Sequence, residues 1–306
     1  MKKMAGMFLG TAVTGFVLLV AIQFSYGEEM KCKECHEDQM NSFLSSHHNK
    51  AWTAKDGASA KSCEACHGPT EKHIEAGGGV ETIISFTKNS KQTATDMSKQ
   101  CLTCHSKLPH LMNWDIGKHK KNDVSCVACH NVHVPRAQMK PKPETCFTCH
   151  KDIKSQVNRL SHHPIMEGKV GCADCHNPHG ENTKSMIKAS TINQLCYKCH
   201  SDKRGPFMWE HPPVEENCTT CHAVHGSQHR SLLVQKSPNL CQNCHHAGGH
   251  PNTMYTAYSA PGRNSTPSPQ MLSRGCINCH VKIHGSNAPN NPGKNAYMNG
   301  GNAFLR

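Results

Sequence analysis

The sequence predicts a mostly coil fold in which short α-helices surround apolar material that the side chains do not supply. Of the 306 residues, 36% are hydrophobic and only 5% are aromatic. That is too little large apolar surface for an ordinary side-chain core in a chain of this length. The chain also contains 20 cysteines and 25 histidines. Their pattern, described next, indicates what fills the interior.

The segment 1–27 is typical of an export signal. Two lysines precede an apolar stretch at residues 7–22, and Ser25 and Gly27 are the small residues expected before a cut. An uncleaved membrane anchor is the alternative, although the apolar stretch is short for a spanning helix and contains glycine. In both interpretations the domain at 28–306 is exported.

Every cysteine belongs to one motif, C-x-x-C-H. This motif is the attachment signature of haem c, in which two thiols bond to the porphyrin and the histidine binds the iron. Exported cysteines can instead form disulfides, and paired cysteines can bind zinc. Neither alternative requires a histidine after every pair. The sequence therefore predicts a multihaem cytochrome c, wrapped around an elongated haem column with little or no β-structure.

Ten such motifs predict ten covalently bound haems, each held by two thioether cysteines and one proximal histidine. The predicted thioether cysteines are Cys32, Cys35, Cys63, Cys66, Cys101, Cys104, Cys126, Cys129, Cys146, Cys149, Cys172, Cys175, Cys196, Cys199, Cys218, Cys221, Cys241, Cys244, Cys276 and Cys279. The predicted proximal histidines are His36, His67, His105, His130, His150, His176, His200, His222, His245 and His280. No cysteine is left over.

The other histidines reveal an internal repeat. Its unit is a motif, a histidine, a second motif and a second histidine. Five copies occupy residues 32–73, 101–133, 146–179, 196–225 and 241–284. Their additional histidines, the candidate distal ligands, are His48, His73, His119, His133, His163, His179, His211, His225, His250 and His284. Ten proximal and ten distal histidines would give every iron two imidazole ligands.

Some alternatives for the distal ligands remain open. Five histidines fall outside the repeat: His47, His110, His162, His229 and His246. His47 could replace His48 and His162 could replace His163, because the members of each pair are adjacent. Methionine is the rival axial ligand, but none recurs at a fixed place in the repeat. The sequence does not assign a distal histidine to a particular haem.

The spacing within the copies nevertheless suggests that ligands are exchanged. In copies two, three and four the second distal histidine lies three residues after a motif histidine. Residues so close in the chain cannot easily reach opposite faces of one iron. We therefore expect His133, His179 and His225 to bind a neighbouring haem. Segments 77–79 and 261–269 are expected to be loops, and 285–306 a flexible tail.

The charge and the ligand count restrict the function. The formal net charge is +12, but each haem adds two propionates, so the basic residues mainly balance them and no nucleic-acid partner is expected. A multihaem enzyme needs an open iron position. Here enough histidines exist to cap every iron, and no motif ends in lysine as at the catalytic haem of nitrite-reducing cytochromes. We expect an electron carrier with no catalytic residues.

Strings around the motifs resemble the MtrA/DmsE/PioA family of decahaem cytochromes. They are C-E-A-C-H-G-P from Cys63, C-A-D-C-H-N-P-H-G from Cys172, K-R-G-P-F-M-W-E-H-P-P-V-E-E-N-C from Lys203 and V-K-I-H-G-S-N from Val281. The resemblance covers nearly the whole chain after the signal segment. The distal-histidine positions of that family fall on the same ten residues that the repeat selects.

The resemblance implies a periplasmic bis-histidine wire that is associated with the outer membrane. Its expected partners are a porin-like β-barrel in that membrane, an outer-surface multihaem cytochrome, and periplasmic or inner-membrane donor cytochromes. Electrons would pass to or from the cell exterior in extracellular metal respiration or oxidation. The alternative is a soluble periplasmic electron shuttle, or a donor to a terminal reductase, that works without a barrel.

Overall fold

A computed structural model describes residues 32–50, 63–87, 89–135, 138, 141–245, 276–278 and 280–287. The predicted signal segment, the loop expected at 261–269 and the tail from residue 288 lie outside these ranges. Two predicted haem residues, His250 and Cys279, also lie outside them.

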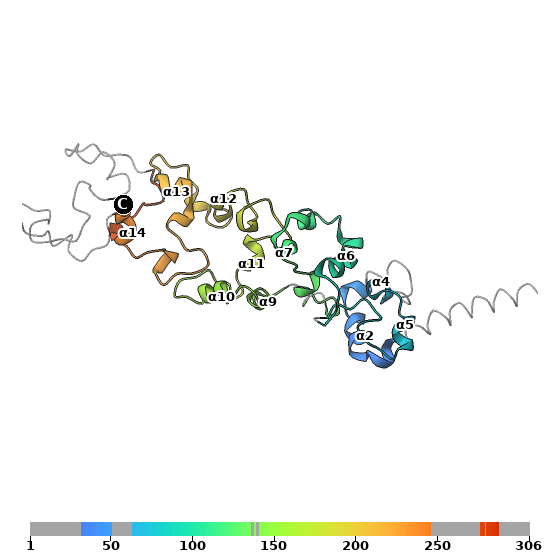
Figure 1. The fold of residues 1–306 in the computed structure, drawn as a ribbon. Coiled ribbons are helices and arrows are strands. Elements are labelled where there is room, and N and C mark those ends of the chain that lie inside the picture. Colours follow the sequence, from blue (N-terminus) through green and yellow to red (C-terminus); the bar gives the residue numbers. More distant parts are fainter. Residues whose placement is uncertain are drawn as a thin grey trace, which may run out of the picture. The chain divides into compact units, whose positions relative to one another are not determined.

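Short helices joined by coil make up the described chain (Figure 1). The α-helices are α2 (Glu37–Leu44), α4 (Glu64–His67), α5 (Glu71–Glu75), α6 (Ala94–His105), α7 (Lys118–Lys121), α9 (Pro143–Phe147), α10 (Lys151–Val157), α11 (Cys172–Cys175), α12 (Ile192–Cys196), α13 (Pro212–Glu216) and α14 (Asn239–Gln242). The 3-10 helices are η1 (Pro109–Leu111), η2 (Trp114–Ile116), η3 (Cys126–Ala128), η4 (Lys184–Met186), η5 (Ser201–Lys203), η6 (Cys218–Thr220), η7 (Arg230–Leu232) and η8 (Cys276–Asn278). The described ranges contain isolated β-bridges but no strand, which confirms the predicted fold class.

The haem motifs themselves form helical turns. In eight motifs the backbone N–H of the histidine donates to the carbonyl of the first cysteine, at distances from 2.8 to 3.1 Å. Because one helical turn spans about four residues, this bond gathers both thiols and the imidazole on one side of the turn. Where the preceding residues favour helix, the turn is extended. Thr93 caps α6 by accepting from the backbone N–H of Asp96, and the helix ends at the motif histidine His105.

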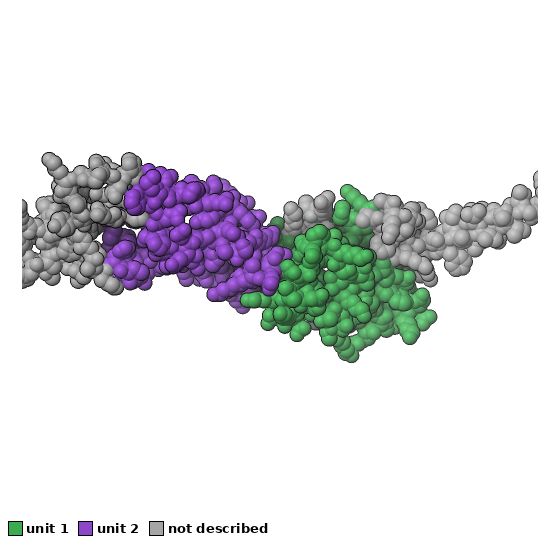
Figure 2. Space-filling view, turned by 90° about the horizontal axis from the view of Figure 1, so that it is seen from above, with its two compact units in different colours: residues 1–146, 178–180 green, residues 147–177, 181–306 purple. Residues whose placement is uncertain are grey.

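The chain divides into two compact units (Figure 2). Unit 1 comprises residues 1–146 and 178–180, and unit 2 comprises 147–177 and 181–306. Among its described residues, each unit has few buried apolar side chains. The buried hydrophobic side chains are Met97, Trp114, Phe147, Val157 and Ile165. Five such residues among those described cannot stabilise a fold of this size, which agrees with the prediction from composition.

Three glycines lie where the chain folds back most tightly. Gly180, Gly226 and Gly285 each directly follow a predicted distal histidine. A Cβ at Gly180 would lie 2.2 Å from the carbonyl oxygen of Asn113, and one at Gly226 would lie 1.9 Å from that of Gln156. A Cβ at Gly285 would lie 2.2 Å from the ring of a phenylalanine. Only glycine permits this close approach, so these positions hold the distal histidines against an earlier segment of the chain.

A substitution at one of these glycines tests the close approach. Gly226→Ala is expected to lower the free energy of unfolding by about 2 kcal/mol, because the new methyl group collides with the backbone at Gln156. Denaturant unfolding of the haem-loaded protein, followed by circular dichroism, measures the change. Gly171→Ala is the matched control, since its Cβ would make only an ordinary contact of 3.6 Å with Asp174. Equal stability of the two variants would contradict the interpretation.

Candidate haem-iron sites

The imidazole rings of motif and distal histidines lie opposite one another in pairs. Eight pairs have ring centroids between 5.9 and 6.3 Å apart. These pairs are His36 with His73, His67 with His133, His105 with His48, His130 with His179, His176 with His225, His200 with His163, His222 with His284, and His245 with His211. Each pair joins a predicted proximal ligand to a predicted distal one.

This separation fits one iron between each pair of rings. A nitrogen of imidazole lies about 2 Å from a metal that it binds, and the centre of the ring lies about 1 Å farther away. Two rings on opposite faces of a haem therefore have centroids about 6 Å apart.

Most of these pairs join a distal histidine of one copy of the repeat to a motif histidine of a neighbouring copy. The second distal histidine of a copy faces the second motif of the preceding copy, as His133 faces His67 and His225 faces His176. The first distal histidine faces the first motif of the following copy, as His163 faces His200. This arrangement matches the expectation that these histidines serve a neighbouring haem.

The remaining predicted ligands have the following places. His73 faces His36 within its own copy. His119 lies in α7, His150 directly precedes α10, and His280 follows η8 with its backbone bonded to Cys276.

Hydrogen bonds hold several of these rings in one tautomer. Six of them place the Nδ1 atom against a backbone carbonyl at 2.8–3.0 Å. The pairs are His67 with Ile84, His73 with Gly79, His119 with Pro178, His163 with Val224, His176 with Ser185, and His222 with Ser231. Because a carbonyl only accepts, Nδ1 carries the proton and donates it. The Nε2 atom then keeps the lone pair that a metal requires.

The environment also favours the neutral ring, which is the form that binds iron. Burial lowers the pKa of six of the paired histidines, because an imidazolium ion is poorly solvated inside the fold. These are His48, His67, His133, His211, His225 and His284. Neighbouring imidazoles lower the pKa further in each case.

The ring positions favour one member of each adjacent histidine pair. His48 faces His105, whereas both ring nitrogens of His162 are otherwise engaged. Its Nδ1 donates to the carbonyl of Arg159 at 2.6 Å, and its Nε2 lies 3.1 Å from the Glu167 carboxylate. The bond to Glu167 raises the pKa of His162. The geometry therefore favours His163 over His162 as a ligand.

Consecutive attachment motifs lie beside one another within each unit. The first cysteines of neighbouring motifs lie beside one another in three places, for example Cys101 and Cys126 in unit 1. Between these places the second cysteines approach, as Cys66 and Cys104 do. The same alternation joins Cys175 to Cys199 and Cys221 to Cys244 in unit 2. The attachment sites thus follow sequence order within each unit.

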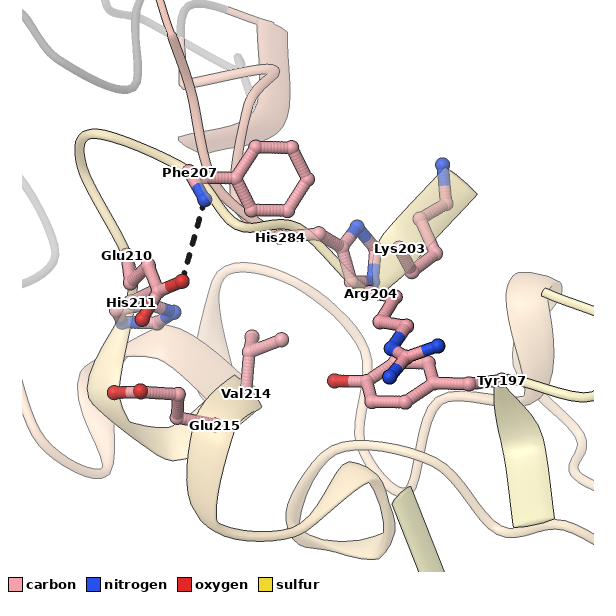
Figure 3. A pocket seen from close by; sticks show the side chains of 9 residues that line it. All are labelled: Tyr197, Lys203, Arg204, Phe207, Glu210, His211, Val214, Glu215 and His284. Atoms are coloured by element: carbon pink, nitrogen blue, oxygen red, sulfur yellow. Dashed lines mark hydrogen bonds between the residues drawn. The ribbon is translucent and has the colours of Figure 1, made fainter. Parts of the chain in front are cut away.

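A hollow in unit 2 lies between rings that serve two different motifs (Figure 3). It is small, with a volume of about 10 Å³, and is lined by Tyr197, Lys203, Arg204, Phe207, Glu210, His211, Val214, Glu215 and His284. His211 faces the ring of His245, and His284 faces that of His222. Lys203 and Arg204 bring positive charge to its wall, where it can balance haem propionates.

Two features of the site carry no signal in the sequence. His110 and Trp114 both pack near the ring of His179, with centroids 5.4 and 6.5 Å from it. The indole Nε1 atoms of Trp114 and Trp209 are buried with no hydrogen-bond partner. A buried donor of this kind is costly, and a haem carboxylate beside it would satisfy it. These contacts depend on segments that are remote in sequence, so spacing alone does not reveal them.

Comparison with known proteins identifies the same chemistry. A family model described as "Doubled CXXCH motif" matches residues 162–205 and 211–250. A second, "Cytochrome c-type protein NrfB-like", matches residues 63–142. The chain is 38% identical over 263 residues to "Multiheme cytochrome MtrA" of Shewanella baltica (strain OS185), which covers 84% of this chain and 78% of that protein. The motifs and these matches together establish covalently bound haem c.

Across the described ranges, none of the helices is both long enough and apolar enough to cross a membrane.

Substitution of the two adjacent histidines tests the choice of ligand. His163→Ala is expected to leave the iron at His200 with an open position and convert about one tenth of the low-spin haem to high spin. Low-temperature EPR of the oxidised protein measures the conversion. His162→Ala is the control and should leave the low-spin intensity unchanged. High-spin signal in the control alone would assign the ligand to His162.

Proposed function

Because the chain belongs to the family of the multihaem cytochrome MtrA, it is an electron-transfer protein, and we propose that it is the periplasmic haem wire of a porin–cytochrome complex in the outer membrane. Within such a complex it would carry electrons between periplasmic donors and the cell exterior. The observation that carries the proposal is the series of histidine ring pairs, each spaced for one iron.

The wire is proposed to contain ten bis-histidine haems. The ten motifs would attach them, and the motif histidines and the ten distal histidines of the repeat would cap them. Haem iron supplies one-electron chemistry between its ferric and ferrous states. The chain supplies the ligands, their tautomers and the order of attachment. Because neighbouring motifs lie side by side within each unit, electrons can pass from haem to haem in sequence order.

The ligand set also supports transport rather than catalysis. An iron that holds an imidazole on each face has no position for a substrate. We therefore propose that the protein is an electron carrier and that its work is to hold the haems at suitable distances and potentials. The direction of electron flow would be set by the partners at either end.

The proposed partners come from the resemblance and from the family. They are a porin-like β-barrel, an outer-surface multihaem cytochrome, and periplasmic or inner-membrane donor cytochromes. The proposed location is the periplasm, at the inner side of the outer membrane. The segment 1–27 would be the signal for export.

Co-purification tests the conduit directly. The protein is tagged at its C-terminus in its native host, export and haem content are verified, and outer membranes are solubilised gently. A β-barrel protein recovered in equal amount with the haem-stained band is expected. The matched control carries the same tag on an unrelated periplasmic cytochrome and should recover no barrel. Recovery of the protein only from the soluble periplasm would reject the conduit and favour a shuttle.

A further inference from the structure

One haem site of unit 1 differs from the others in the orientation of its ligands. The rings of His48 and His105 are nearly perpendicular, with an interplanar angle of 82°. In six other pairs the angle is only 11–28°. The pair of His163 and His200 lies between, at 55°. We refer to the haem that Cys101 and Cys104 would attach, with His48 and His105 as its axial ligands, as the Cys101 haem.

The same site lacks a hydrogen bond that the repeat provides elsewhere. The first distal histidine of a copy donates from Nδ1 to the residue that precedes the second distal histidine of the next copy. His163 donates to Val224 in this way, and His119 to Pro178. By contrast, the Nδ1 atom of His48 is buried and has no hydrogen-bond partner.

The sequence supplies a physical reason for this difference. The second distal histidines of copies three, four and five are followed by glycine, whereas His133 of copy two is followed by Val134. At Gly226 a Cβ would lie 1.9 Å from the carbonyl oxygen of Gln156, in the segment that leads to His163. A branched side chain at the equivalent position prevents that approach. The sequence of copy two therefore does not allow the close contact that Gly226 makes.

The missing hydrogen bond affects the reduction potential in a known direction. A donor bond from Nδ1 gives the imidazole more negative character and makes it a stronger ligand to iron. A stronger ligand stabilises the ferric state and lowers the potential. Without that bond, His48 is the weaker ligand, and the potential of its haem is higher.

The perpendicular ring orientation also raises the reduction potential, and it changes the EPR signal of the ferric haem. A bound imidazole donates π-electron density into the iron d orbital perpendicular to its ring plane. Parallel rings both raise one orbital, which stabilises the ferric ion and gives a rhombic three-line low-spin EPR signal. Perpendicular rings raise two orbitals equally, so this stabilisation is lost. The ferric signal then becomes highly anisotropic, with a single feature at large g.

We propose that the Cys101 haem has a more positive reduction potential than the haems held by near-parallel ring pairs and that it retains an electron longest within unit 1. The proposal rests on the bis-histidine wire described above. In the step concerned, one electron passes from a neighbouring ferrous haem to the ferric Cys101 haem. The neighbour is oxidised, the Cys101 iron is reduced, and no bond is made or broken.

A redox titration of the intact haem-loaded protein, followed by low-temperature EPR, tests this. His48→Ala is expected to remove the large-g low-spin component and to introduce high-spin signal of about one haem in ten. The matched variant His225→Ala should instead remove rhombic intensity from the haem at His176. In the unmodified protein, the component assigned through His48 should disappear at a more positive potential than the component assigned through His225.

Two results would overturn the proposal. One is the loss of rhombic rather than large-g intensity in His48→Ala, and the other is a midpoint potential equal to or below that of the His225 component. If His48→Ala fails to load haem, the EPR-monitored redox titration of the unmodified protein still tests the proposal. A large-g component must then be present and must be reduced before the rhombic majority. Failure of the bis-histidine wire itself would be distinct, since it would give high-spin signal in the unmodified oxidised protein.

Discussion

The pairing of histidine rings from neighbouring copies of the repeat is the constraint on which the remaining structure depends. Each pair of rings belongs to two different copies, apart from the pair at the start of the chain. A haem attached to one segment and ligated by a histidine of another would connect the two, and its porphyrin would supply the apolar surface of a hydrophobic core. This explains how a chain with so few buried apolar side chains among its described residues can hold a defined fold.

Close backbone contacts make the exchange specific. Glycine after a second distal histidine lets that segment approach the one before a first distal histidine, as at Gly226 and Gln156. The approach brings the carbonyl of Val224 to the ring of His163, so the ligand of one haem is oriented by the segment that carries the ligand of the next. Where Val134 replaces glycine, this coupling is absent at His48.

The structural requirements of the proposed electron-transfer wire differ from those of an enzyme. Imidazole on both faces of an iron would exclude substrates, and alternating approaches of first and second cysteines keep neighbouring attachment sites close. Buried cofactors in a row require few specific side chains beyond these ligands. Differences in hydrogen bonding and ring orientation remain as the means to set potentials along the wire.

The sequence by itself determined the fold class, the covalent haem c and the repeat that selects the distal histidines, because covalent attachment demands a local motif that spacing reveals. It also predicted that His133, His179 and His225 would reach beyond their own motif. Only the tertiary structure decided which rings face one another, why His163 rather than His162 is placed for an iron, and which ring lacks a hydrogen bond. These outcomes depend on backbone approach between segments about sixty residues apart, such as His163 and Val224, and spacing within one copy does not encode that approach.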